Sequence, residues 1–168
     1  MKNSFVLVSI LLIIAIIALS GCIYEEGTGI LVLQITDAPP NLDIAKALVN
    51  ISHIEVHLIA TGWFTVIEKP QAFDLIVIKN VKKFLGSVNL SVGRYSQIRL
   101  QVESALVTIN GIDYDLKIPS KTVKLISPFS IYANKTTTLT LDFDVQESIH
   151  SSSQDKYIMN PTIKVIQE

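Results

Sequence analysis

Residues 106–118 have the sequence LVTINGIDYDLKI, in which two runs of strand-forming residues flank Asn110 and Gly111. Both residues tolerate a positive φ, which a type I′ turn requires at its two central positions. The stretch therefore predicts a β-hairpin that joins a strand over 106–109 to a strand over 113–118. Strands joined by such a short turn pair antiparallel.

The same two-residue period extends along most of the chain. In residues 50–59, polar side chains alternate with apolar ones, as in a strand with one face in a core. Further strand-like runs are 30–35, 63–67, 73–78, 94–103, 123–126, 129–132, 136–145 and 162–166. Only 43–48 and 81–85 could form helices, and both are too short to cover a parallel α/β sheet. His150 and the serines at 151–153 are expected in a loop.

These patterns predict an all-β domain over residues 29–168. We expect an antiparallel β-sandwich of the immunoglobulin-like or transthyretin-like kind. The formal net charge of the chain is −1, so it offers no net basic field for a phosphate backbone, and nucleic acid is not expected as a partner.

An apolar leader precedes the predicted domain. Residues 5–19 contain no charged residue, and Lys2 lies before them. This order is typical of an export signal, and the apolar run is shorter than the roughly 20 residues that a spanning helix needs. We therefore expect a signal segment over 1–22, with 23–28 as a short polar spacer.

The one cysteine of the chain, Cys22, follows Leu19, Ser20 and Gly21 at the end of this leader. The four residues resemble the lipobox of prokaryotic lipoproteins, in which the cysteine carries a glycerol-linked lipid and becomes the first residue of the mature chain. An uncleaved anchor helix over residues 4–23 is the alternative. Both interpretations attach the domain to the cell membrane and place it outside the cytoplasm.

Three polar residues of one strand, His53, Glu55 and His57, are candidate metal ligands because alternate residues share one face. Residues i and i+4 of a strand lie roughly 13 Å apart, so all three cannot simply converge on one ion. A solvated outer face is the alternative for these residues.

A second candidate site comprises three aspartates. Asp142 and Asp144 share a strand face, and Asp37 could join them around a hard cation such as calcium. Asp37 is equally suited to forming a turn before residues 38–40, because its carboxylate can accept backbone N–H groups.

Two further kinds of candidate site are an aromatic binding platform and N-glycosylation acceptors. Trp63 could form a platform for sugars or peptides with Phe64 and Tyr95, although a core position is the alternative. Asn-x-Ser/Thr acceptors for N-glycosylation occur at Asn50, Asn89 and Asn134. The serines have no evident histidine and acid partners, so no catalytic residues and no cofactor are expected.

Several short segments also follow one another in a specific order. They are 33–39 (LQITDAP), 49–57, 73–75, 93–100 (GRYSQIRL), 118–120, 139–144 and 157–165. Together they resemble a prokaryotic family of domains of unknown function, number 4382, which is found in many exported lipoproteins. Departures from its pattern are confined to turns, at 90–93, 119–121 and 160–161. The resemblance implies a β-sandwich and a surface location, and brings no established activity.

The sequence thus favours a lipid-anchored surface domain that binds a ligand, a protein or a glycan, or that builds part of the envelope. One alternative is an accessory solute-binding lipoprotein. The other is a metal-dependent enzyme that uses the histidine strand or the pair Asp142 and Asp144.

Overall fold

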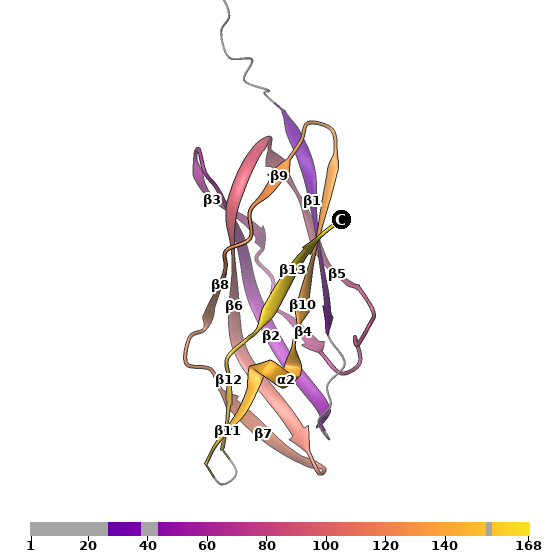
Figure 1. Cartoon of the computed structure of the whole chain (residues 1–168), viewed down its shortest axis with the longest axis vertical. Coiled ribbons are helices and arrows are strands. Elements are labelled where there is room, and N and C mark those ends of the chain that lie inside the picture. The colour runs from indigo at the N-terminus through magenta and orange to yellow at the C-terminus, as the bar shows by residue number, and fades with distance from the viewer. Residues whose placement is uncertain (1–26, 38–43, 154–155) are drawn as a thin grey trace, which may run out of the picture.

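The computed structural model describes residues 27–37, 44–153 and 156–168, so the predicted signal segment, Cys22 and most of the spacer lie outside the described residues. Almost all described elements are strands, with one short helix (Figure 1). They are β1 (Thr28–Asp37), β2 (Ile44–Leu58), β3 (Gly62–Ile67), β4 (Gln71–Asp74), β5 (Lys83–Ser91), β6 (Gly93–Ile109), β7 (Ile112–Lys117), β8 (Thr122–Leu125), β9 (Phe129–Ile131), β10 (Thr136–Phe143), α2 (Val145–Ser148), β11 (Ile149–Ser153), β12 (Lys156–Met159) and β13 (Ile163–Gln167).

The strands form two sheets. The first has the order β13-β10-β1-β5, and the second has the order β11-β12-β7-β6-β2-β3, with β4 beside β2 and with β8 and β9 beside β6. The expected all-β class is confirmed. The expectation of purely antiparallel sheets is wrong, because β1 pairs with β10 and β7 with β12 in parallel. Parallel neighbours need a long connection, and side-chain periodicity does not report the direction of a partner strand.

One hydrophobic core joins the two sheets. Leu31 and Leu33 of β1 and Ile54 and Val56 of β2 are completely buried within it. Successive side chains of a strand point to opposite faces, so the residues between these apolar positions are directed away from the core. The alternation in the sequence therefore decides which side chains lie on the outer faces.

Strand β6 is the longest element, and it replaces the two separate strands expected over 94–103 and 106–109. Its pairing with β2 continues through a register shift, in which Asn50 pairs with Ser104 and Ile51 with Val102. Such a bulge re-aims side chains without ending a strand. The predicted hairpin follows β6 and is confirmed, with φ of 52° at Asn110 and 77° at Gly111.

Several local expectations were wrong. The two segments considered as helices begin β2 and β5 instead, because their residues pair with β6 and β1. Residues 149–153, expected as a loop, form β11 and pair with β12. The strand expected to reach residue 145 ends at Phe143, and α2 follows it. The strand expected over 73–78 ends at Asp74. In the described part of the chain, no helix has the length and hydropathy needed to cross a bilayer.

Candidate functional site

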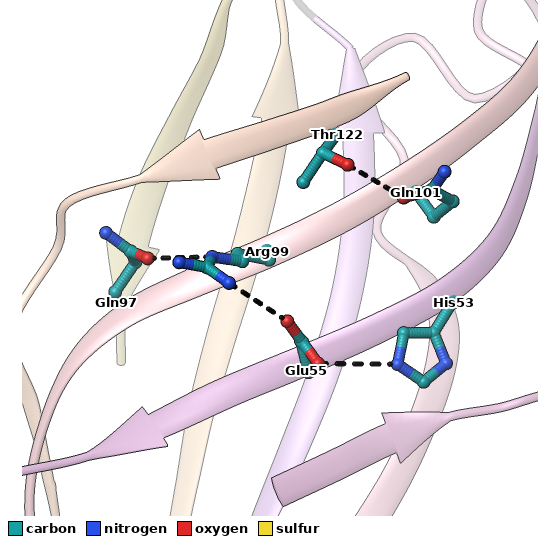
Figure 2. Close-up of polar contacts among 6 residues, drawn as sticks. All are labelled: His53, Glu55, Gln97, Arg99, Gln101 and Thr122. Atoms are coloured by element: carbon teal, nitrogen blue, oxygen red, sulfur yellow. Dashed lines mark hydrogen bonds and ion pairs between the residues drawn. The ribbon is translucent and has the colours of Figure 1, made fainter. Parts of the chain in front are cut away.

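A cluster of polar side chains covers the outer face of the second sheet over β2 and β6 (Figure 2). Ile54 and Val56 point into the core, and His53, Glu55 and His57 therefore point outward, as the sequence indicates. These three side chains are only half-buried. They are accessible to a molecule that approaches this face.

Glu55 and Arg99 form the centre of the cluster, because they lie opposite each other in the β2–β6 register. The Arg99 Nη1 lies 3.6 Å from the Glu55 Oε1, and the Glu55 Oε2 lies 3.6 Å from the His53 Nε2. The Arg99 Nε donates a hydrogen bond of 3.0 Å to the Gln97 Oε1. Figure 2 shows this row of contacts crossing from one strand to the next.

Trp63 extends the cluster onto β3, where it pairs with His57. The guanidinium carbon of Arg99 lies 3.8 Å from the centroid of the Trp63 ring. The His57 ring meets the Trp63 ring edge-on at 4.8 Å, and the His57 Nδ1 lies 3.0 Å from the Ser96 Oγ. We call His53, Glu55, His57, Trp63, Gln97 and Arg99 the Arg99 cluster. Its side chains hold one another in place before any ligand binds.

The predicted aromatic platform is not brought together. Trp63 is 37% exposed, on the outer face, whereas Tyr95 is completely buried. Phe64 packs against the core on the opposite side of β3, with its ring 6.5 Å from the Tyr95 ring. Alternation along β3 separates Trp63 from Phe64. The core alternative for Trp63 is also wrong.

The histidine strand does not form a three-ligand site. Glu55 interacts with Arg99 and His53, and His57 interacts with Ser96 and Trp63. Among residues 27–37, 44–153 and 156–168, no group of three or more His, Cys, Asp or Glu side chains is arranged to hold a metal ion. The Arg99 cluster offers hydrogen-bond donors, hydrogen-bond acceptors and the indole ring of Trp63 to a ligand.

Asp37 lies on the core side at the end of β1 and is only 1% exposed. Its Oδ1 accepts a hydrogen bond of 3.2 Å from the backbone N–H of Val145, and its buried Oδ2 has no hydrogen-bond partner among residues 27–37, 44–153 and 156–168. Burial raises the pKa of Asp37 to about 7, and the charges of Asp142 and Asp144 act in the same direction, while Lys79 and the Val145 bond oppose them. The carboxyl group of Asp37 therefore keeps its proton at pH values at which an ordinary aspartate is ionised.

The other two aspartates of the predicted cation site have separate roles. Asp142 pairs in register with Lys164 of β13, and desolvation raises the pKa of Asp142. Asp144 is the N-cap of α2, and its carboxylate accepts the backbone N–H of Glu147 at 3.0 Å. Asp37, Asp142 and Asp144 interact electrostatically, and they are not arranged as a metal-binding group.

The glycosylation candidates differ in accessibility. Asn50 is half-buried within β2, whereas Asn89 of β5 and Asn134 in the connection to β10 are exposed. Asn134 has a φ of 56°, as is common for asparagine in tight turns.

Sequence reasoning missed the role of Arg99. It lies in the segment 93–100 and alternates with Ile98 and Leu100, which are buried. This alternation already places Arg99 and Gln97 on an outer face. The register that brings Arg99 to Glu55 depends on bulges in β2 and β6, and no local pattern reports it.

Comparison with protein-family models identifies the family of this chain. The model of the family described as "Domain of unknown function (DUF4382)" matches residues 28–161, which span the strands from β1 to β12. No match was found among curated proteins or among solved structures.

Proposed function

The chain belongs to the DUF4382 family, and on that premise we propose that it is a membrane-anchored surface lipoprotein whose domain binds a ligand or partner without catalysis. Residues 23–168 would then lie outside the cytoplasm, attached at the cell membrane through Cys22. The partner is a protein or a glycan rather than a nucleic acid, because the chain has a formal net charge of −1.

The geometry of the Arg99 cluster is the main support for a binding role. Its planar polar groups and its half-exposed indole ring are fixed by mutual contacts, so little side-chain freedom would be lost when a partner binds. Tryptophan and arginine are also the residue types most enriched where binding energy concentrates. The apolar side chains on the inner face of β2 and β6 are buried, and their packing keeps the outer face rigid.

Crosslinking on intact membranes tests this role. We expect a partner that crosslinks to the full chain to be lost in Trp63→Ala and in Arg99→Gln. Phe84→Ala is the matched control, because Phe84 is an exposed aromatic residue on β5 of the other sheet. Equal crosslinking by all three variants, with unchanged circular dichroism, would contradict the proposal. A glycan array probed with the same variants tests the glycan alternative.

Lipid attachment is tested separately at Cys22. The lipobox-like residues 19–22 support it, together with the apolar run over 5–19. Cys22→Ser should abolish incorporation of labelled lipid precursor and the corresponding mass shift. Ser20→Ala, which leaves the cysteine in place, is the control. Labelling that persists in Cys22→Ser would contradict lipid attachment at Cys22, and a wild-type chain that incorporates no label would favour the uncleaved apolar anchor.

We also propose that the two sheets form a sandwich of the immunoglobulin-like or transthyretin-like kind. Support comes from the single core that both sheets share. Such a sandwich would leave the outer face of β2 and β6 open to solvent, as a binding role requires. An experimental structure with a different layer arrangement would contradict this assignment.

A further inference from the structure

One end of the domain lies where the described chain begins. The Gly27 carbonyl accepts the backbone N–H of Val92 at 3.0 Å, and the Thr28 carbonyl accepts that of Asn134 at 2.9 Å. The backbone N–H of Ile59 donates to the carbonyl of Arg94 at 3.1 Å. Two connections therefore meet the start of β1 and a third meets the connection at Arg94, all at the upper end in Figure 1. We call residues 59–62, 91–94 and 132–135 the tether end.

The tether end combines exposed apolar surface with positive charge. Ile59 is 58% exposed and Tyr132 is 52% exposed. The Lys135 Nζ lies 5.7 Å from the centroid of the Tyr132 ring, and Arg94 lines a shallow hollow beside Tyr132. The three segments contain no aspartate or glutamate.

The opposite end has a different character. The hairpin at Asn110 and Gly111 is followed by Asp113 on β7, and α2 contains Glu147. Figure 1 shows β7 and α2 at the lower end, far from the start of β1. Carboxylates therefore lie towards this end, whereas the three segments of the tether end contain none.

If the chain is anchored at Cys22 as proposed above, the short segment between Cys22 and Gly27 keeps the tether end close to lipid. Five residues lead from Cys22 to Gly27, and fully extended they span at most about 18 Å. Tyrosine side chains favour the membrane–water interface, and lysine and arginine bind anionic headgroups there. Residues 23–28 contain two glutamates, Glu25 and Glu26, and the tether end contains two cations, Arg94 and Lys135, so the two parts together have no net charge. Burial of Ile59 and Tyr132 must therefore contribute to contact.

We propose that the tether end is a lipid-contacting surface. Ile59 and Tyr132 insert at the headgroup boundary, and Arg94 and Lys135 bind lipid phosphates. The proposal rests on the anchoring proposed above and adds an orientation to it. β2 and β6 run along the long axis of the domain (Figure 1), so the Arg99 cluster would face sideways above the membrane, open to a partner. A glycan on Asn134 would prevent this contact, so Asn134 should be unmodified.

Single-tryptophan reporters test the contact in the full chain. In a Trp63→Phe background, Tyr132→Trp reports on the tether end, and Ile112→Trp is the matched control at the opposite end, where Ile112 is 56% exposed. Each chain is reconstituted into vesicles of phosphatidylcholine and phosphatidylglycerol, part of which carries bromine near the headgroup. We expect strong quenching and a blue shift for Tyr132→Trp and neither for Ile112→Trp. Equal quenching of both reporters overturns the proposal.

Two further arms separate the outcomes. Vesicle flotation reports anchoring alone, so a chain that floats without quenching at position 132 overturns only the lipid contact, whereas a chain that does not float overturns both proposals. Ile59→Trp provides a second reporter, should Tyr132→Trp not fold.

Replacing Arg94 and Lys135 with glutamine tests the role of their charges. Each replacement should weaken the contact with anionic vesicles about fivefold. The same changes at Lys117 and Lys124, outside the tether end, should have no effect, and equal weakening would contradict the role of Arg94 and Lys135.

Discussion

The guanidinium group of Arg99 on β6 lies over the indole ring of Trp63 on β3, with its carbon 3.8 Å from the ring centroid, although β2 separates the two strands. Glu55 of the intervening strand holds the same guanidinium group through an ion pair. Side chains from three strands are thus fixed in one arrangement on the outer face. A substitution of any one of these side chains should therefore change the positions of the other two.

Arg99→Met tests this coupling. Methionine keeps an unbranched apolar stem but lacks the guanidinium group, so both the contact with Trp63 and the ion pair with Glu55 are lost. We expect destabilisation of about 1 kcal/mol, because both interactions are partly solvent-exposed. Trp63 is the single tryptophan, so its emission should shift with the loss of the cation. Lys124→Met, the residue opposite Arg99 on β8, is the control. Identical spectra for wild type and Arg99→Met would show that the stacking does not persist in solution.

The buried Asp37 predicts a pH dependence of stability. Its pKa is raised from 3.8 to about 7, so the folded state keeps a proton that the unfolded state releases within this window. The free energy of unfolding should therefore fall as the pH rises through the window, by at most about 1.4 kcal/mol per pH unit, and level off above it. The raised pKa of Asp142 acts in the same direction. Urea unfolding at a series of pH values measures this slope.

Asp37→Asn isolates the contribution of this carboxyl group. The amide oxygen of asparagine can still accept the backbone N–H of Val145, and no charge must be buried at high pH. We expect a flatter profile and a higher stability than wild type at about pH 8. Asp115→Asn removes an exposed carboxylate and should leave the slope unchanged. A wild-type slope that persists in Asp37→Asn would assign the pH dependence to other groups.

The sequence predicts features that depend on neighbouring residues. The hairpin at Asn110 and Gly111 follows from the φ values that these residues tolerate, and the outward direction of Glu55 follows from alternation. Alternation also places Asp37 on the same side as Leu33 and Ile35, and this signal predicts its burial more directly than its proline-rich neighbours predict a turn.

Features that depend on strands distant in sequence could not be predicted in this way. The Arg99–Glu55 pair requires the correct β2–β6 register, which shifts at several points. The parallel pairing of β1 with β10 depends on the path of the chain through all the strands between them, from β2 to β9. For Trp63 the sequence left open an aromatic platform and a core position, and its actual place on the outer face follows from its position on β3 opposite His57.

The conformation of the turn after β6 predicts how adding one methyl group at Gly111 changes the stability of the domain. Gly111 has a φ of 77°, where a Cβ is disfavoured by roughly 1 kcal/mol, so Gly111→Ala should lower stability by about this amount. Asn110→Gly keeps a residue that accepts positive φ and should be nearly neutral. Thermal melts of both variants measure the difference. Equal melting temperatures for the two variants would show that the turn has another conformation in solution.

Tyr95 links the core to the tether end. Its buried ring stacks on Phe129 at 5.0 Å between centroids, and its hydroxyl donates a hydrogen bond of 2.9 Å to the carbonyl of Ser91. Burial raises the pKa of Tyr95 to about 12, so the hydroxyl remains protonated and keeps donating at neutral pH. The bond therefore fixes the connection from which Val92 donates to Gly27.

Tyr95→Phe should remove this bond while preserving the stacked ring. Because the Ser91 carbonyl loses a buried donor, we expect a loss of about 1 kcal/mol, against roughly 3–5 kcal/mol for Tyr95→Ala, which also leaves a cavity. Hydrogen exchange at the Val92 amide should accelerate more than exchange at core amides of β2. Tyr132→Phe, at an exposed ring, should change neither property. Unchanged exchange at Val92 in Tyr95→Phe would mean that the start of β1 holds this connection without help from the core.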